Sequence, residues 1–115
     1  MRRPSGGGED NQAVPFHSTI SGGASNLITG TSSWAGIGTG YQNVITGSAP
    51  YATIAGGWAN TANAGSATIG GGFANIAGGA ATVGGGWSNT ASGEHATVGG
   101  GAGNKASAGG FRARS

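Results

Sequence analysis

The sequence contains no cysteine, which excludes disulfide bonds, thiolate metal sites and cysteine nucleophiles. Charged residues make up only 7% of its 115 residues, and none lies between Asp10 and Glu94. The chain therefore offers no basic stripe for a nucleic acid and no aspartate series for calcium. Its apolar runs are far shorter than the roughly 18 residues of a membrane span, and no apolar segment of a signal peptide follows Arg2 and Arg3. We expect neither nucleic-acid binding nor membrane insertion.

Large side chains are also scarce, because aromatic residues make up 7% of the chain while glycine accounts for 28 of the 115 residues. Average proteins contain about 7% glycine, and glycine-rich chains without a period usually remain disordered. This composition excludes a conventional core of large side chains. Whether the chain folds therefore depends on whether its sequence repeats.

A repeat runs through most of the chain. Six aliphatic residues, which we call the anchors, recur every 14–17 residues. A glycine follows each anchor three residues later, and an asparagine follows it six residues later, in all six units. The anchors are Ile20, Ile37, Ile54, Ile69, Val83 and Val98, and the asparagines are Asn26, Asn43, Asn60, Asn75, Asn89 and Asn104.

Within each unit, apolar and polar residues alternate over about five residues, as in Ala52–Gly56 and Asn43–Gly47. This alternation is typical of short half-buried strands, and the fixed glycines suit turns that need a positive φ. We predict an all-β fold, a parallel β-roll (β-solenoid) of about six two-strand coils of 14–17 residues. The predicted domains are a flexible tail over 1–15, the repeat over 16–108, and over 109–115 a tail or the start of a truncated half-coil.

Stacked coils place equivalent residues above one another. We expect the anchors to face inward, and the asparagines to bond neighbouring backbone groups and the asparagine one coil away. Four aromatic residues, each four positions after an anchor, should stack on an outer corner and form the candidate contact surface. Because so thin a core buries little apolar area, we expect lateral self-association through this corner and through Leu27, Val44 and Ile76. The four aromatic residues are Tyr41, Trp58, Phe73 and Trp87.

The units Ala67–Gly79 and Ala81–Gly93 resemble the YadA-like head repeats of trimeric autotransporter adhesins, which also occur in surface fibres. The resemblance covers residues 16–115 and is strongest over 51–106. It implies a left-handed β-roll, a homotrimer of chains packed side by side, and an extracellular, cell-surface or virion-fibre location. It also implies a host matrix protein or a glycan as partner. The family's stalk and membrane anchor have no counterpart in this sequence, and the first two coils are longer than the family's.

A second resemblance is to the repeats of grass ice-recrystallisation-inhibition proteins, whose x-x-N-x-V-x-G pattern matches Ala24–Gly30 and Tyr41–Gly47. Those proteins are β-rolls that bind ice through a flat, threonine-rich face, so ice binding is the alternative function. Threonine recurs immediately before the anchors, but small residues occupy the companion position two residues later. A two-rank threonine lattice is therefore missing, and outward threonine is also common in ordinary strands. The threonines are Thr19, Thr53, Thr68, Thr82 and Thr97.

Residues able to carry out chemistry are few. His17 and His95 occupy the same position in coils about 24 Å apart at the usual strand spacing, so they do not share a metal ion. Glu94 lies next to His95 and is consistent with a solvated turn. The glycine runs lack the Lys-Ser/Thr of a phosphate-binding loop, and no serine is placed with a histidine and an acid. We expect a non-enzyme with no cofactor and no metal site.

Overall fold

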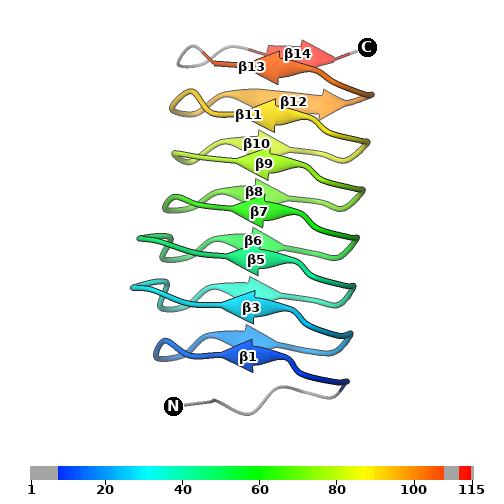
Figure 1. Ribbon diagram of the computed structural model, residues 1–115. Helices are drawn as coiled ribbons and strands as arrows, with labels where there is room; N and C mark the ends of the chain where they lie inside the picture. The colour runs from blue at the N-terminus through cyan, green and yellow to red at the C-terminus, as the bar shows by residue number, and fades with distance from the viewer. Residues whose placement is uncertain (1–7, 108–111, 115) are drawn as a thin grey trace.

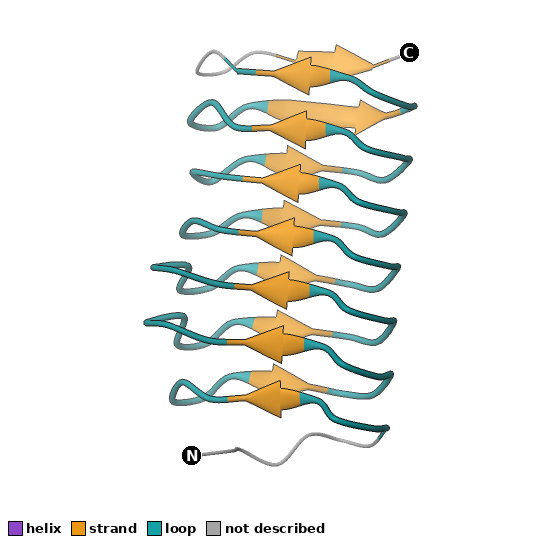
Figure 2. Cartoon of the chain, in the orientation of Figure 1, coloured by secondary structure: helices purple, strands orange, loops and turns teal. Residues whose placement is uncertain are grey.

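The computed structural model describes residues 8–107 and 112–114 of the chain. The chain winds in about six stacked turns, and the fold is the predicted all-β solenoid of parallel strands (Figure 1). Short strands and turns alternate, and the described residues contain no helix (Figure 2). The resulting rod measures 37 × 22 × 13 Å along its principal axes.

The odd-numbered strands form one seven-stranded parallel sheet, which faces the viewer in Figure 1. Each strand is two residues long, and its first side chain points outward while its second is buried. Each coil thus contributes one rung to this side of the rod. The strands are β1 (Gln12–Ala13), β3 (Leu27–Ile28), β5 (Val44–Ile45), β7 (Thr61–Ala62), β9 (Ile76–Ala77), β11 (Thr90–Ala91) and β13 (Lys105–Ala106).

The even-numbered strands form a second seven-stranded parallel sheet on the far side. The anchors are the buried residues of this sheet and pair in register, so that Ile37 lies between Ile20 and Ile54. The predicted stacking of equivalent residues is thereby confirmed. The strands are β2 (Thr19–Ile20), β4 (Gly36–Ile37), β6 (Thr53–Ile54), β8 (Thr68–Ile69), β10 (Thr82–Val83), β12 (Thr97–Gly100) and β14 (Arg112–Arg114).

The winding of the chain is left-handed. With the amino terminus at the bottom, the near strands run to the left and the far strands to the right as the chain rises (Figure 1). The longer first coils are accommodated on one edge, where Thr31–Ser33 and Ser48–Pro50 lie in loops that project beyond the others. Extra residues are therefore absorbed outside the stack, and the register of the strands is kept.

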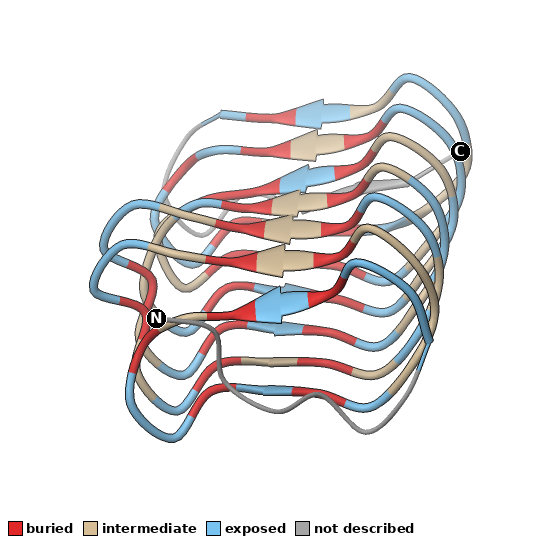
Figure 3. Cartoon of the chain, turned by 60° about the horizontal axis from the view of Figure 1, so that its bottom comes forward, coloured by how far each residue is buried: buried red, intermediate tan, exposed pale blue. Residues whose placement is uncertain are grey.

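The core is a thin layer between the two sheets. The anchors are at most 1% exposed, and they face a second column that begins with Ala13, Ile28 and Ile45 and continues with four more alanines. In Figure 3 the buried positions alternate with exposed and intermediate ones along every strand. These four later alanines of the second column are Ala62, Ala77, Ala91 and Ala106, all fully buried.

The first half-coil lies inside the range predicted to be a flexible tail. Strand β1 pairs in parallel with β3, and Asn11 and Ala13 are buried at 4% and 0% exposure. The boundary predicted at residue 16 is therefore too late, because Asn11-Gln12-Ala13 repeats the half-unit Asn26-Leu27-Ile28 without an aliphatic anchor before it. At the other end, β14 pairs with β12, as a further half-coil would, while residues 108–111 and 115 lie outside the described residues.

The turns use positive φ at many residues that are not glycine, which the sequence did not predict. Two columns adopt it in coil after coil, for example Ala74 at φ 58° and Ala80 at φ 51°. This conformation costs an L-residue about 1–2 kcal/mol. It is imposed by the stack, because the amide of Ala74 donates to Trp58 O at 2.9 Å and that of Ala80 to Gly65 O at 2.9 Å. Hydrogen bonding to the preceding coil thus outweighs the preference of these residues for negative φ.

Candidate functional site

The asparagines form a continuous column, the asparagine ladder, which runs along one inner edge of the rod and is buried except at its last member, the half-buried Asn104. The amide N of Asn60 and its Nδ2 both donate to Asn43 Oδ1, at 3.0 and 3.1 Å. The same Nδ2 also donates to Gly56 O at 3.2 Å and to Gly72 O at 2.9 Å. These side chains point inward as predicted. The amides of Asn26, Asn43, Asn60 and Asn75 each bond three consecutive coils, so the ladder has a structural role and leaves little capacity for a ligand.

The four aromatic residues form a second column, the aromatic ladder, on the outer corner of the same turns. Their backbones are joined by parallel bridges from coil to coil. Ring centroids are 6.3 Å apart between Tyr41 and Trp58, 4.7 Å between Trp58 and Phe73, and 6.1 Å between Phe73 and Trp87. The rings are tilted by 41–46° and contact one another, yet Tyr41, Trp58 and Trp87 remain 46%, 50% and 59% exposed. The rings thus lie stacked on an exposed corner, and their role as a contact surface stays a prediction.

The opposite edge carries a shorter group of aromatic residues in the first three coils. Trp34 stacks on His17 at 4.0 Å with an angle of 14° between the rings, and Phe16 and Tyr51 are also strongly exposed. Trp34, at 56% exposure, belongs to a positive-φ column and not to the aromatic ladder. The two edges thus present separate aromatic surfaces.

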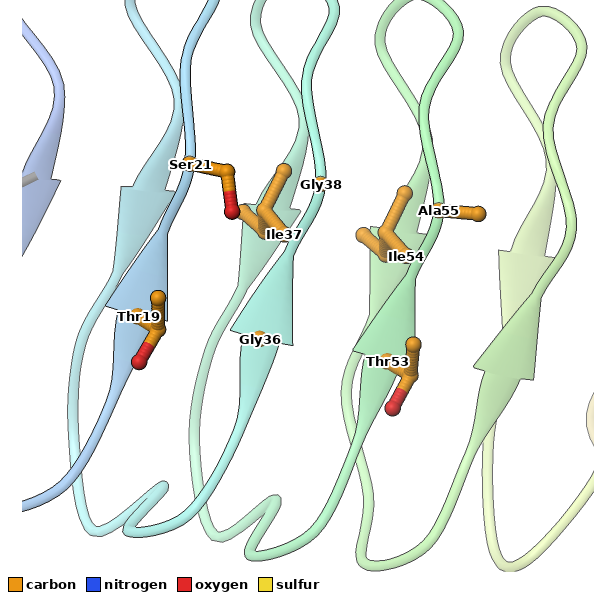
Figure 4. A pocket seen from close by; sticks show the side chains of 8 residues that line it. All are labelled: Thr19, Ser21, Gly36, Ile37, Gly38, Thr53, Ile54 and Ala55. Carbon is orange, nitrogen blue, oxygen red and sulfur yellow. The ribbon is translucent and has the colours of Figure 1, made fainter. Parts of the chain in front are cut away.

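The threonines before the anchors lie on the outer face of the sheet of even-numbered strands. Thr53, Thr68, Thr82 and Thr97 pair in register on four successive strands. Gly36 interrupts the column between Thr19 and Thr53, and with Gly38 it leaves an open depression of about 330 Å³ (Figure 4). Two threonines flank bare backbone there, so the threonine face is not continuous.

The opposite sheet has an uncharged, partly apolar outer face in its middle coils. Leu27 and Val44 are half-buried, and Ile76 is 38% exposed. The strands of this face pair in register, so that Thr61 lies between Val44 and Ile76 and Thr90 follows Ile76. This surface is the second one that the sequence predicted for self-association.

The remaining polar groups do not converge. His17 and His95 lie in the first and last repeats of their column, and no group of three or more metal-ligating side chains occurs among the described residues. Within that same part of the chain, no helix has the length and apolar character needed to cross a membrane. The surface features of this molecule are therefore its ladders and sheet faces.

No protein-family model matches the chain, and no curated protein sequence matches it.

Sequence reasoning missed one member of the asparagine ladder. Asn11 is buried, and its Oδ1 accepts from Asn26 N at 3.0 Å and from Asn26 Nδ2 at 3.1 Å. The signal was available in the spacing of Gly8 and Asn11, which equals that of Gly23 and Asn26. Asn11 has no aliphatic anchor six residues before it, because Ser5 stands at that position.

Proposed function

We propose that this chain is a structural and adhesive β-roll segment of an extracellular fibre or adhesin head, which acts without catalysis by rigid, multivalent display. The observation that carries the proposal is the aromatic ladder: exposed rings held in line along a rod. Large exposed apolar surfaces of this kind usually mark interaction sites. Because every coil is tied to the next through the asparagine ladder and the backbone, the rings present several weak contacts that act together.

The partner in assembly is proposed to be a second and third copy of the chain, packed side by side through the face of Leu27, Val44 and Ile76. The broad side of the rod measures 37 × 22 Å, close to the 800 Å² or so that each partner buries in a standard interface. The face carries no charge between Gln12 and Lys105, so no unpaired charge would be buried. Light scattering on the purified chain should give three times the mass of one chain.

The adhesive function is tested by comparing the binding of beads that carry few copies of the chain with that of beads that carry many. The chain is coupled through a terminal tag to beads, densely or sparsely, and binding to an extracellular-matrix coat, a polysaccharide coat and an albumin coat is measured. Dense beads should bind the matrix or polysaccharide coat far more strongly than sparse beads, because weak contacts add. Beads that bind no coat better than albumin would contradict the proposal.

Ice binding remains the second candidate, favoured by the four in-register threonines from Thr53 to Thr97. Against it stand the interruption at Gly36 and the small residues at the companion positions, which leave one rank of hydroxyl groups. An ice binder should shape ice crystals and slow their recrystallisation, and Thr68→Val with Thr82→Val should change that activity. We expect the wild-type chain to leave ice growth unaffected.

A further inference from the structure

The glycines beside the aromatic ladder fall into two kinds. Gly72 is required by the fold, because its φ is +94° and an added Cβ would lie 2.1 Å from Gly86 O in the next coil. Its neighbour Gly71 has no positive φ, and an added Cβ would meet nothing within 4 Å. The same holds for Gly85, and Gly56 would meet only ordinary contacts at 3.6 Å or more. The fold therefore gives no reason for glycine at this second position.

This second position lies two residues before each ring, and it is glycine before Trp58, Phe73 and Trp87 but Thr39 before Tyr41, so bare backbone runs beside the last three rings of the aromatic ladder. Glycine costs roughly 0.4–1 kcal/mol of stability wherever alanine fits without strain. Unforced glycine is often found where a ligand approaches the backbone closely. The same unforced glycine also precedes Ala24 and Ala102, where the coil has no ring, and beside Trp58, Phe73 and Trp87 it leaves the surface free of side chains.

The same turns also present hydrogen-bond donors. The amide N–H groups of Gly71 and Gly72, and those of Gly85 and Gly86, donate to no acceptor in the described part of the chain. All four glycines are half-buried or exposed, so an approaching molecule can reach the turns. Backbone amides are strong donors that seek acceptors. A molecule that lies on the rings and also reaches these turns is best matched if it carries oxygen acceptors.

The charge around the ladder restricts the partner further. No charged side chain lies between Asp10 and Glu94, and Glu94 is the one charged residue in the coils that carry the rings, so these coils have little charge to attract an acidic or a basic polymer. An aromatic ring has a negative face, which suits the weakly positive C–H groups of a sugar ring. The combination of exposed rings, unbonded donors and little charge fits a neutral carbohydrate.

We propose that the aromatic ladder and its flanking glycine turns bind a neutral, extended polysaccharide of equatorially linked sugars, lying along the rod axis. This proposal rests on the adhesive function proposed above and names its ligand class. Successive coils are spaced by about 4.8 Å, so the ladder offers a repeating surface to a repeating chain. Hydroxyl and ring oxygens accept from the glycine amides while sugar C–H faces cover the rings.

A second copy of the chain is a poorer occupant of this corner. If two identical corners met, the unpaired amides of one copy would face the unpaired amides of the other, without acceptors between them. The face of Leu27, Val44 and Ile76 has no such conflict and remains the proposed assembly surface. The aromatic ladder is then left open for the polysaccharide.

Binding is tested on the full 115-residue chain with cellohexaose and N-acetylchitohexaose, by calorimetry and tryptophan fluorescence. At least one of these probes should bind, and the hexasaccharide should bind at least tenfold more tightly than the matching disaccharide, because it spans several rings. A heparin hexasaccharide serves as the acidic probe and should bind at least tenfold more weakly. Failure of both neutral probes at millimolar concentration, or tighter binding of heparin, overturns the proposal.

Three variants separate the site from general stability. Trp58→Ala with Trp87→Ala should weaken binding at least tenfold, while Trp34→Ala, an equally exposed tryptophan on the opposite edge, should change it less than twofold. Gly71→Ala with Gly85→Ala should raise the thermal midpoint and still weaken binding several-fold. Equal losses for the two edges, or unchanged binding in the glycine variant, would refute the assignment of the site.

The bead assay keeps this inference distinct from the adhesive function. If beads bind the matrix coat but the chain binds neither oligosaccharide, the adhesive function stands and the polysaccharide assignment fails, with a protein as the ligand. If beads bind no coat, the adhesive function fails as well. If light scattering finds an oligomer and the tryptophan emission shifts to shorter wavelength on assembly, the rings are covered by a second copy of the chain. That result would assign the corner to self-association and refute the inference.

Discussion

Removing one side chain from the middle of the asparagine ladder should destabilise the whole rod. In Asn60→Ala, three bonds from Nδ2 are lost, to Asn43 Oδ1, Gly56 O and Gly72 O. Two bonds accepted by Asn60 Oδ1 are also lost, from the backbone N and the Nδ2 of Asn75. At about 1 kcal/mol net for each of the five bonds, and about 1–3 kcal/mol for the one buried N–H left without an acceptor, the loss is about 6–8 kcal/mol. Typical domains are stable by about 5–15 kcal/mol, so this variant should be nearly or fully unfolded.

The assay is urea unfolding followed by circular dichroism and tryptophan fluorescence, with Asn63→Ala as the matched control. Asn63 lies three residues away with an exposed side chain, so the control should lose less than about 0.5 kcal/mol. Asn60→Asp keeps the shape but replaces the Nδ2 donor, and a buried carboxylate there would face two carbonyl oxygens. Relative to wild type it should be less destabilised at pH 3, where the acid is protonated, than at pH 7. A loss below 1 kcal/mol in Asn60→Ala would refute the structural role of the ladder.

The remaining predictions concern the core, the turns and assembly. Ile54→Ala empties a fully buried anchor and should cost about 2–5 kcal/mol in the same urea assay, and a loss under 1 kcal/mol would mean that the thin core does not stabilise the fold. Gly72→Ala should destabilise by more than 2 kcal/mol, whereas Gly71→Ala should stabilise by about 0.4–1 kcal/mol, and equal effects would contradict the two kinds of glycine. Val44→Glu places a charge on the proposed assembly face and should convert the trimer to monomer in light scattering without lowering the monomer's dichroism. If this variant remains a trimer, the interface lies on another surface of the chain.

The sequence predicts most of this fold because each structural role recurs at a fixed offset. The strands, the inward asparagines and the aligned rings all follow from the spacing of anchors such as Ile54 and Val83. The first half-coil was missed because it has no aliphatic anchor. Positive φ at Ala74 and Ala80 was missed because it comes from bonding between coils, which local preference does not contain.

The candidate site was only partly predictable for a related reason. The sequence places the rings on one corner, since their offset is constant. It does not distinguish Gly71 from Gly72, because both are simply glycine in the printed chain. Only the positions of the neighbouring carbonyl groups show that the fold requires glycine at position 72 and has room for a side chain at position 71. The trimer, the extracellular location and the adhesive role stay predictions.

Because the coils carry almost no charge, the rod should respond only weakly to the salt concentration around it. Interactions between exposed charges weaken as salt rises, over a screening distance of about 10 Å at 0.1 M. From residue 11 to residue 93 there is no Asp, Glu, Lys or Arg for salt to screen. The structure of these coils, and the contacts that they make with other molecules, should therefore change little between low and high ionic strength.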